Sequence, residues 1–128
     1  VMAAFTTPAQ AAAAALAIQQ EIAEFNADSG DRALTVKLGI HDGPSIVVTL
    51  NGRLDYFGST VNKAARLQGC SKGGDIVISQ SSAGDPEVER LLVGSRATIE
   101  SARLKGFDGP VHFTRIAPHE PLVSANEA

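Results

Sequence analysis

The residues whose types and spacing could do chemistry fall within one stretch, from Asp55 to Arg66, which reads Asp-Tyr-Phe-Gly-Ser-Thr-Val-Asn-Lys-Ala-Ala-Arg. An acid stands before a glycine turn, and an amide and a guanidinium follow at a four-residue spacing. Ser59 or Thr60 is expected to cap a helix that opens at the next valine. Asn62 and Arg66 would then share one face of that helix, because residues i and i+4 are neighbours on a helix surface. The stretch therefore predicts two polar side chains directed at one ligand.

A β-hairpin is expected to bring Asp55 to its place. Runs rich in β-branched residues at 34–41 and 45–50 predict two strands. Asn51-Gly52 then gives the strongest two-residue hairpin signal, and the chain returns through residues 53–57. Asp55 therefore lies near the end of a hairpin strand, and the helix that follows is expected to run from Val61 to about Gln68.

The N-terminal part predicts a strand and then a long helix. Residues 1–5 form a short apolar run that reads as a buried strand. Thr7 is expected to cap the helix, with Pro8 in its first turn and an end near Ala27. Apolar residues in this helix recur at three- and four-residue steps, which predicts one stripe packed on a sheet. The stripe consists of Ala15, Ile18, Ile22 and Phe25.

The remaining elements complete a sheet covered by helices. Strands are expected at residues 75–79, 96–104 and 111–116, and a short helix opens at Asp85-Pro86 and continues through Leu92. This succession of strands and helices argues for an α+β or α/β domain. Residues 118–128 contain Pro, Glu and Ser and are expected to form a flexible tail.

The composition is that of an ordinary globular domain. Of the 128 residues, 44 % are hydrophobic and 20 % are charged, and the net charge of −3 gives no basic field for a nucleic acid, so we expect no nucleic acid as a partner. The alanine-rich run Ala9–Ile18 is followed by polar residues, so it reads as a helix of a soluble protein and not as a membrane segment. Cys70 is the only cysteine, which excludes an intrachain disulfide and makes a cytoplasmic location the default.

The stretch from Asp55 to Arg66, together with Gly39-Ile-His-Asp-Gly-Pro44, resembles the catalytic domain of class III nucleotide cyclases, which convert ATP or GTP to the cyclic monophosphate. The resemblance covers nearly all of residues 1–116, and Asp, Gly, Val-Asn and Ala-Ala-Arg fall at the family's spacings. It implies an α+β fold, a ferredoxin-like-derived and antiparallel-rich sheet with helices packed on it, truncated at the N-terminus. Residues 1–117 would then be a partial domain that lacks the first strand, the first helices and part of the central hairpin.

The resemblance implies a role for each residue of the stretch. Arg66 matches the arginine that stabilises charge on the α-phosphate while the ribose 3′-hydroxyl attacks it, and Asn62 matches the asparagine that orients the ribose. Asp55 matches the acid that accepts a hydrogen bond from the adenine amino group, so the implied substrate is ATP, with GTP less favoured. Phe57 is also expected to be a substrate-binding residue.

A further contact is expected from Lys105, which lies where the family brings a basic side chain to the triphosphate. The position that best matches the usual phosphate-binding lysine is instead occupied by Phe107. This difference from the family pattern makes Lys105 a substitute for that lysine.

Cofactors and partners also follow from the resemblance. Members of the family hold two Mg²⁺ or Mn²⁺ ions with a pair of aspartates. Neither aspartate is present in this sequence, so we assign no metal ligand to it and expect the 128 residues by themselves to be inactive. The family's active sites form across a head-to-tail homodimer, and upstream regulatory domains in a longer chain are expected. Asp55, Asn62 and Arg66 would form one wall of such a site.

Other residues are assigned to structure. His41 lies in a Gly-Ile-His-Asp-Gly turn without a second ligand at metal spacing, and Asp42 reads as a turn residue. Lys72 lies in a glycine-rich loop that lacks the P-loop pattern, so it reads as a surface residue.

Two other classes of protein stay open. One is a non-catalytic cyclase-homology domain that binds a nucleotide or serves in dimerisation and regulation, and the residues before Val1 would separate it from an enzyme. The other is a ferredoxin-like domain that binds nucleic acid. The net acidity and the small number of aromatic residues disfavour that second class.

Overall fold

A mixed four-stranded sheet organises the chain in the computed structural model, which describes residues 1–118 apart from the side chains of residues 50, 54 and 55. The prediction of a flexible tail therefore falls, from residue 119 onward, outside the described residues. β1 runs parallel to β4, and β4, β6 and β5 are antiparallel neighbours. In spatial order the strands are β1 (Leu38–Ile40), β4 (Ile76–Ser79), β6 (Pro110–Ala117) and β5 (Arg96–Arg103).

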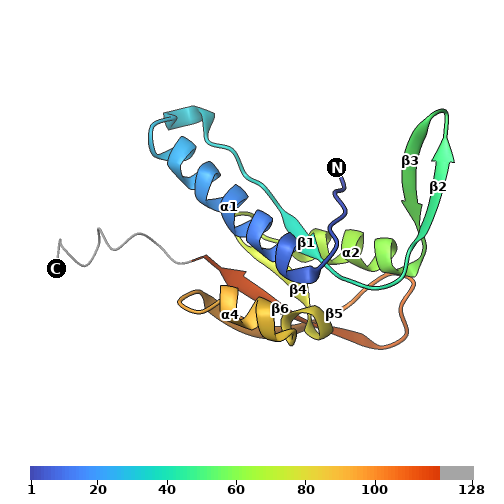
Figure 1. Cartoon of the computed structure of the whole chain (residues 1–128). Coiled ribbons are helices and arrows are strands. Elements are labelled where there is room, and N and C mark those ends of the chain that lie inside the picture. Colours follow the sequence, from blue (N-terminus) through green and yellow to red (C-terminus); the bar gives the residue numbers. More distant parts are fainter. Residues whose placement is uncertain (119–128) are drawn as a thin grey trace.

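Helices pack against this sheet, and a separate β-hairpin projects from it (Figure 1). The arrangement confirms the α+β fold class with an antiparallel-rich sheet. The helices are α1 (Pro8–Ala27), the 3₁₀ helix η1 (Gly30–Arg32), α2 (Ser59–Cys70), α3 (Gln80–Ala83) and α4 (Pro86–Leu91). The hairpin consists of β2 (Ile46–Leu50) and β3 (Arg53–Phe57).

β4 is buried on both faces and divides the core in two. Ile76 and Ile78 pack with residues of α1 and α4, whereas Val77 packs with Leu67 of α2 and Phe113 of β6. Successive side chains of a strand point to opposite faces, so α1 with α4 covers one face of the sheet and α2 covers the other. A continuous apolar strand is what such two-sided burial requires.

Most predicted elements are confirmed. The cap of α1 by Thr7, its end at Ala27, the strands near residues 75–79, 96–104 and 111–116, and the start of α4 at Asp85-Pro86 are all present. The hairpin turn is also confirmed, since Asn51 and Gly52 both have positive φ (52° and 75°), as a type I′ turn requires. α3 was not predicted, because a four-residue helix is too short to show a periodic pattern.

The prediction of a buried strand over residues 1–5 is wrong. These residues are exposed and belong to no strand, and they extend from the start of α1 away from the sheet (Figure 1). A strand is stable only when a neighbour accepts and donates its backbone hydrogen bonds, and none of the described strands pairs with this segment.

The predicted stripe of α1 is confirmed at Ala15, which is buried, and is wrong for its two large members Ile18 and Phe25. Ile18 and Phe25 are 40 % and 50 % exposed, and the buried positions are Ala12, Ala15 and Gln19. The small alanines let the helix approach the sheet closely. The Gln19 amide nitrogen donates to the carbonyl oxygens of Val36 (3.0 Å) and Asp75 (2.7 Å), so a buried polar contact takes the place of an apolar one.

The first predicted strand is shorter than residues 34–41, since only Leu38–Ile40 pairs with a neighbour. Before it, the Val36 carbonyl accepts from Gln19 and from the Gly74 amide, which replaces ladder hydrogen bonds.

α2 lies unusually close to β1 because Gly39 has no side chain. A Cβ atom built on Gly39 would lie 2.3 Å from the Gln68 backbone nitrogen and 2.7 Å from the Ala64 carbonyl oxygen. Backbone atoms in the middle of a helix cannot move aside singly, so a larger residue here must displace the whole helix.

We predict that Gly39→Ala lowers the free energy of unfolding by about 1–3 kcal/mol through overpacking. The matched control is Gly69→Ala in α2, where an added Cβ has no atom within 4 Å. That change should stabilise the protein by about 0.5–1 kcal/mol through better helix propensity. Urea unfolding followed by circular dichroism measures both, and equal midpoints for Gly39→Ala and the wild type would contradict the close contact.

Candidate functional site

α2 separates a packed face from a solvent-facing one. Leu67 is fully buried on the inner face, whereas Asn62 and Arg66 are exposed and lie one helical turn apart on the outer side. The two residues that the sequence predicted to share a face therefore do so. Their amide and guanidinium groups can contact one ligand.

The start of α2 differs from the prediction. Its N-cap is Gly58 with φ 119°, and neither Ser59 nor Thr60 caps the helix with its side chain. The Thr60 hydroxyl instead donates to the Pro44 carbonyl oxygen of the loop between β1 and β2. This contact ties the first turn of α2 to that loop. The chain can turn into the helix at residue 58 because a glycine readily adopts a backbone conformation with positive φ.

A shallow pocket of about 260 Å³ lies where the hairpin meets the first residue of α2. Phe57 lines it and is 43 % exposed, so its ring is available to a flat ligand group. The other lining residues are Pro44, Ser45, Ile46, Gly58 and Ser59. The Asp55 backbone pairs with Val48 in the hairpin, but the Asp55 side chain lies outside the described part of the structure.

The loop between β5 and β6 packs beneath α2. Phe107 is partly buried and, with Leu104, packs in the cluster around Leu67, the residue that follows Arg66. Phe107 therefore fills an apolar space at the position where the family pattern has a lysine. Lys105 lies exposed in the same loop.

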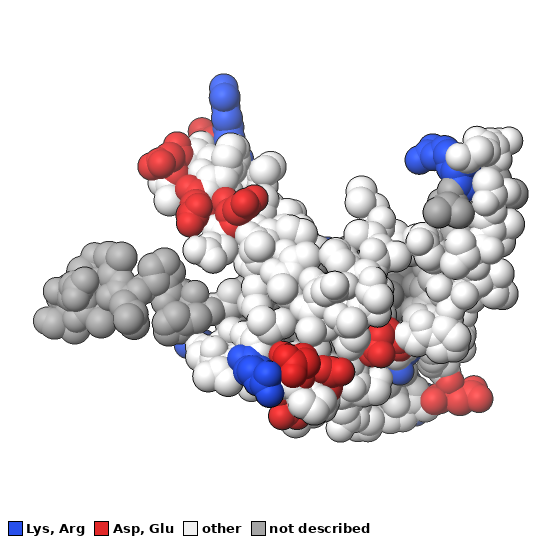
Figure 2. All heavy atoms as spheres, in the orientation of Figure 1, with Lys and Arg blue, Asp and Glu red and all other residues white. Residues whose placement is uncertain are grey.

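The face between α1 and the hairpin is concave and carries few charges. Figure 2 shows Lys, Arg, Asp and Glu mainly at the margins of this face. A nucleic-acid backbone requires a run of basic side chains, and this face does not present one. Large apolar side chains of β2 in the hairpin are exposed, with Ile46 at 63 % and Val47 at 52 %.

A chain of hydrogen bonds that the sequence did not reveal links His41 to Asp42. The Ser82 hydroxyl donates to the Asp42 carboxylate, and the Ser79 hydroxyl donates to Ser82 Oγ at 2.9 Å. His41 Nδ1 lies 2.7 Å from Ser79 Oγ. With the Ser79 proton directed at Ser82, this last bond is satisfied by the tautomer in which His41 Nδ1 is the donor.

The sequence signal for this network is topological. His41 follows β1 and Ser79 ends β4, and these two strands are parallel. The carboxyl ends of parallel neighbouring strands meet at one edge of a sheet, so polar residues there come together. Only the pairing of β1 with β4, which a single sequence does not specify, was missing.

The network lies close to the candidate site through Lys63 of α2. Burial and the positive charge of Lys63 lower the pKa of His41 below its ordinary 6.5, and the negative charge of Asp42 opposes them. The lowered pKa keeps His41 mainly neutral near pH 7.

The described residues do not form a metal site. Among the described side chains, which do not include that of Asp55, there is no group of three or more His, Cys, Asp or Glu that could hold an ion. The residues present thus do not fit the two-ion centre expected from the resemblance. Among the same residues, no helix is long and apolar enough to cross a membrane.

The fold is that of nucleotide cyclase catalytic domains. The structure is similar to that of an adenylate/guanylate cyclase/hydrolase from Silicibacter pomeroyi, with a TM-score of 0.68 and 28 % identity over 91 % of this chain and 66 % of that one. The chain belongs to the adenylate and guanylate cyclase catalytic domain family, whose model matches residues 3–99.

Relatives by sequence include proteins named adenylate cyclase. The chain is 32 % identical to an adenylate cyclase of Mycosarcoma maydis over 92 residues, which is 70 % of this chain and 3 % of that protein. It is also 32 % identical to an adenylate cyclase of Lachancea kluyveri over 120 residues, which is 78 % of this chain and 6 % of that protein. The chain thus spans only a small part of the length of these relatives.

We predict that neutral His41 carries its proton on Nδ1, which is the less common tautomer of an unconstrained histidine side chain. The ¹⁵N chemical shifts of the ring should show this, and a pH titration should give a midpoint below 6.5. In Ser82→Ala the Ser79 hydroxyl is released to donate to Nδ1, so the preference should weaken. A protonated Nε2 in the wild type would contradict the direction of the chain.

His41 also makes stability depend on pH in a defined direction. Its pKa in the folded state is below 6.5, so the unfolded chain takes up a proton first as the pH falls. The stabilising contribution of neutral His41 is complete above pH 6.5 and is lost as the pH falls below that value.

Proposed function

We propose that this domain forms part of an adenylate cyclase, which converts ATP to cyclic AMP and pyrophosphate. The observation that carries the proposal is the presentation of Asn62 and Arg66 on one exposed face of α2, within a segment that the family model matches. The adenylate cyclases among the relatives support ATP as the substrate.

The reaction needs positioning and charge stabilisation. The ribose 3′-oxygen forms a bond to the α-phosphorus, the bond from that phosphorus to the bridging oxygen breaks, and pyrophosphate leaves while the hydroxyl proton is lost. Asn62 would hold the ribose in line by hydrogen bonding. Arg66 would offer two donors to the phosphate oxygens on which negative charge builds up.

The base-binding side of the site would be the pocket beside the hairpin. Phe57 would supply an apolar surface for the purine, and Asp55 would accept a hydrogen bond from its amino group. Lys105, in the loop packed beneath α2, would reach the triphosphate. Within the proposal, these residues make up one wall of the site.

The other wall would come from a second copy of the chain in a homodimer, and the divalent ions that members of this family use would be bound there. Because the described residues do not form a site for two metal ions, no step of the reaction is assigned to a metal held by them. We accordingly propose that the 128 residues alone are inactive, and that the complete protein, in the cytoplasm, contains further domains.

A second candidate is a domain that binds a nucleotide without turning it over. Phe107 in place of a lysine and the lack of a carboxylate cluster among residues 1–118 favour it. ATP binding by the full-length protein without formation of cyclic AMP would identify this alternative.

We predict that Arg66→Ala lowers the turnover of ATP by the full-length protein about a hundredfold, as expected for loss of one preorganised charge-stabilising group. Cyclic AMP release measures the rate. Arg90→Ala is the matched control, since Arg90 lies exposed on α4 and contacts only Glu87 among the described residues. Turnover at the wild-type rate in Arg66→Ala would refute the role of this guanidinium.

Replacement of Asp55 by alanine should chiefly change selectivity. The carboxylate accepts from the adenine amino group but has no donor for the guanine carbonyl, so Asp55→Ala should reduce the ratio of kcat/KM for ATP to that for GTP, by about tenfold for one lost hydrogen bond to a charged group. Competition between the two nucleotides measures this ratio. An unchanged ratio would remove Asp55 from base recognition.

A further inference from the structure

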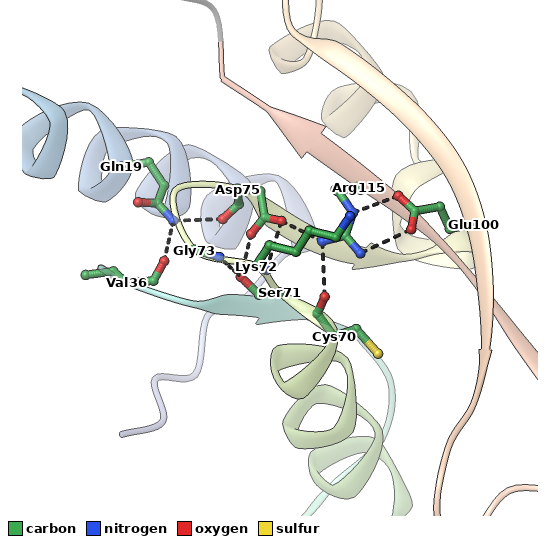
Figure 3. A network of polar contacts seen from close by, with 9 residues as sticks. All are labelled: Gln19, Val36, Cys70, Ser71, Lys72, Gly73, Asp75, Glu100 and Arg115. Atoms are coloured by element: carbon green, nitrogen blue, oxygen red, sulfur yellow. Dashed lines mark hydrogen bonds and ion pairs between the residues drawn. The ribbon is translucent and has the colours of Figure 1, made fainter. Parts of the chain in front are cut away.

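The most buried ionic cluster of the described residues lies at the opposite end of α2 from the pocket (Figure 3). Arg115 of β6 makes an ion pair with Asp75 (Nη1 to Oδ2, 2.5 Å). It also makes a bidentate ion pair with Glu100 of β5 (Nε to Oε2, 2.7 Å; Nη2 to Oε1, 3.1 Å). The Arg115 side chain is only 14 % exposed and that of Asp75 only 9 %.

The same guanidinium also holds the last residue of α2. Arg115 Nη1 donates to the Cys70 carbonyl oxygen at 3.1 Å. The final carbonyl groups of a helix have no partner within the helix, and a cation near them is favourable for the helix dipole. Arg115 therefore satisfies the C-terminal end of the helix that carries Asn62 and Arg66.

Asp75 secures the turn that leaves the helix. It accepts hydrogen bonds from the Ser71 hydroxyl and from the Lys72 backbone amide (3.1 Å). Burial opposes ionisation of Asp75, but these bonds and Arg115 outweigh it, so its pKa is lowered. The hydrogen bonds from Arg115 likewise lower the pKa of Glu100, and the pKa of Arg115 is raised by Glu100 and Asp75 despite its burial. All three groups are thus charged near neutral pH.

Arg115 consequently touches two elements that bear proposed substrate contacts. Its bond to Cys70 fixes α2, and its bonds to Glu100 fix β5, which leads into the loop that contains Lys105. Catalytic groups must be held to within a fraction of an ångström, and supporting residues provide that precision.

We propose that Arg115 is a positioning residue, which sets the placement of α2 relative to the β5–β6 loop and so aligns Arg66 and Lys105 on the same triphosphate. The proposal rests on the proposed function. A role in stability alone is the competing explanation. Buried ion pairs are weak evidence for stability, since apolar replacement of a whole cluster is often neutral, although removal of one partner is costly.

The test compares Arg115→Lys and Arg115→Met with Arg96→Met in the full-length protein. Lysine keeps the charge but cannot reach Cys70, Asp75 and Glu100 together, because it lacks the planar fork. Arg96 lies exposed on β5, the strand that pairs with β6, and its replacement controls for the loss of an arginine. We expect Arg115→Lys to unfold at the wild-type midpoint and to have a KM for ATP within about twofold of the wild-type value. Its kcat should fall about ten- to a hundredfold.

A second readout does not depend on catalysis. Amide hydrogen exchange over residues 66–70 should be about tenfold faster in both Arg115 variants than in Arg96→Met, because the end of α2 opens more often. Should Arg115→Met fail to fold, Arg115→Lys decides the question. Wild-type kcat in a folded Arg115→Lys variant would overturn the proposal.

The same readout separates this proposal from the proposed function. If the wild-type protein makes no cyclic nucleotide, the cyclase proposal fails, and with it the alignment on a triphosphate. Faster exchange at residues 66–70 would then still support Arg115 as the anchor of α2. Unchanged exchange in both variants would overturn the anchor as well.

Discussion

The contact between the backbones of α2 and β1 at Gly39 is the constraint on which the rest of the structure depends. A Cβ atom there would lie 2.3 Å from the Gln68 nitrogen, so only a glycine at this position lets the helix lie this close to the sheet. Leu67 then enters the core beside Val77, and the outer side of the same turn faces solvent. The hydrogen bond from Thr60 at one end and that from Arg115 at the other hold the helix along its axis.

Much of this fold could be predicted from the sequence because the signals are local. Asn51-Gly52 specifies its turn, Thr7 with Pro8 specifies a helix start, and the four-residue spacing of Asn62 and Arg66 specifies a shared face. These depend on the conformations of a few neighbouring residues, which the residue types nearly determine.

The features that could not be predicted depend on which strands are neighbours. The burial of Gln19, the exposure of Ile18 and the unpaired residues 1–5 follow from where the sheet lies, and helical periodicity alone does not contain that information. The ion cluster around Arg115 joins residues forty positions apart, which no spacing rule connects. Sequence reasoning therefore located the proposed ligand-facing residues but missed what holds them.

The hydrogen-bonded chain from His41 to Asp42 has a consequence for inheritance. Each of its members fixes the proton direction of the next, so the effect of replacing one depends on whether the others are intact. A lone change at Ser82 releases the Ser79 hydroxyl and so changes which tautomer of His41 the chain favours. A compensating change at Ser79 or His41 could restore the match. These positions are expected to change together through evolution as one epistatic unit, although they come from a loop, a strand and a helix.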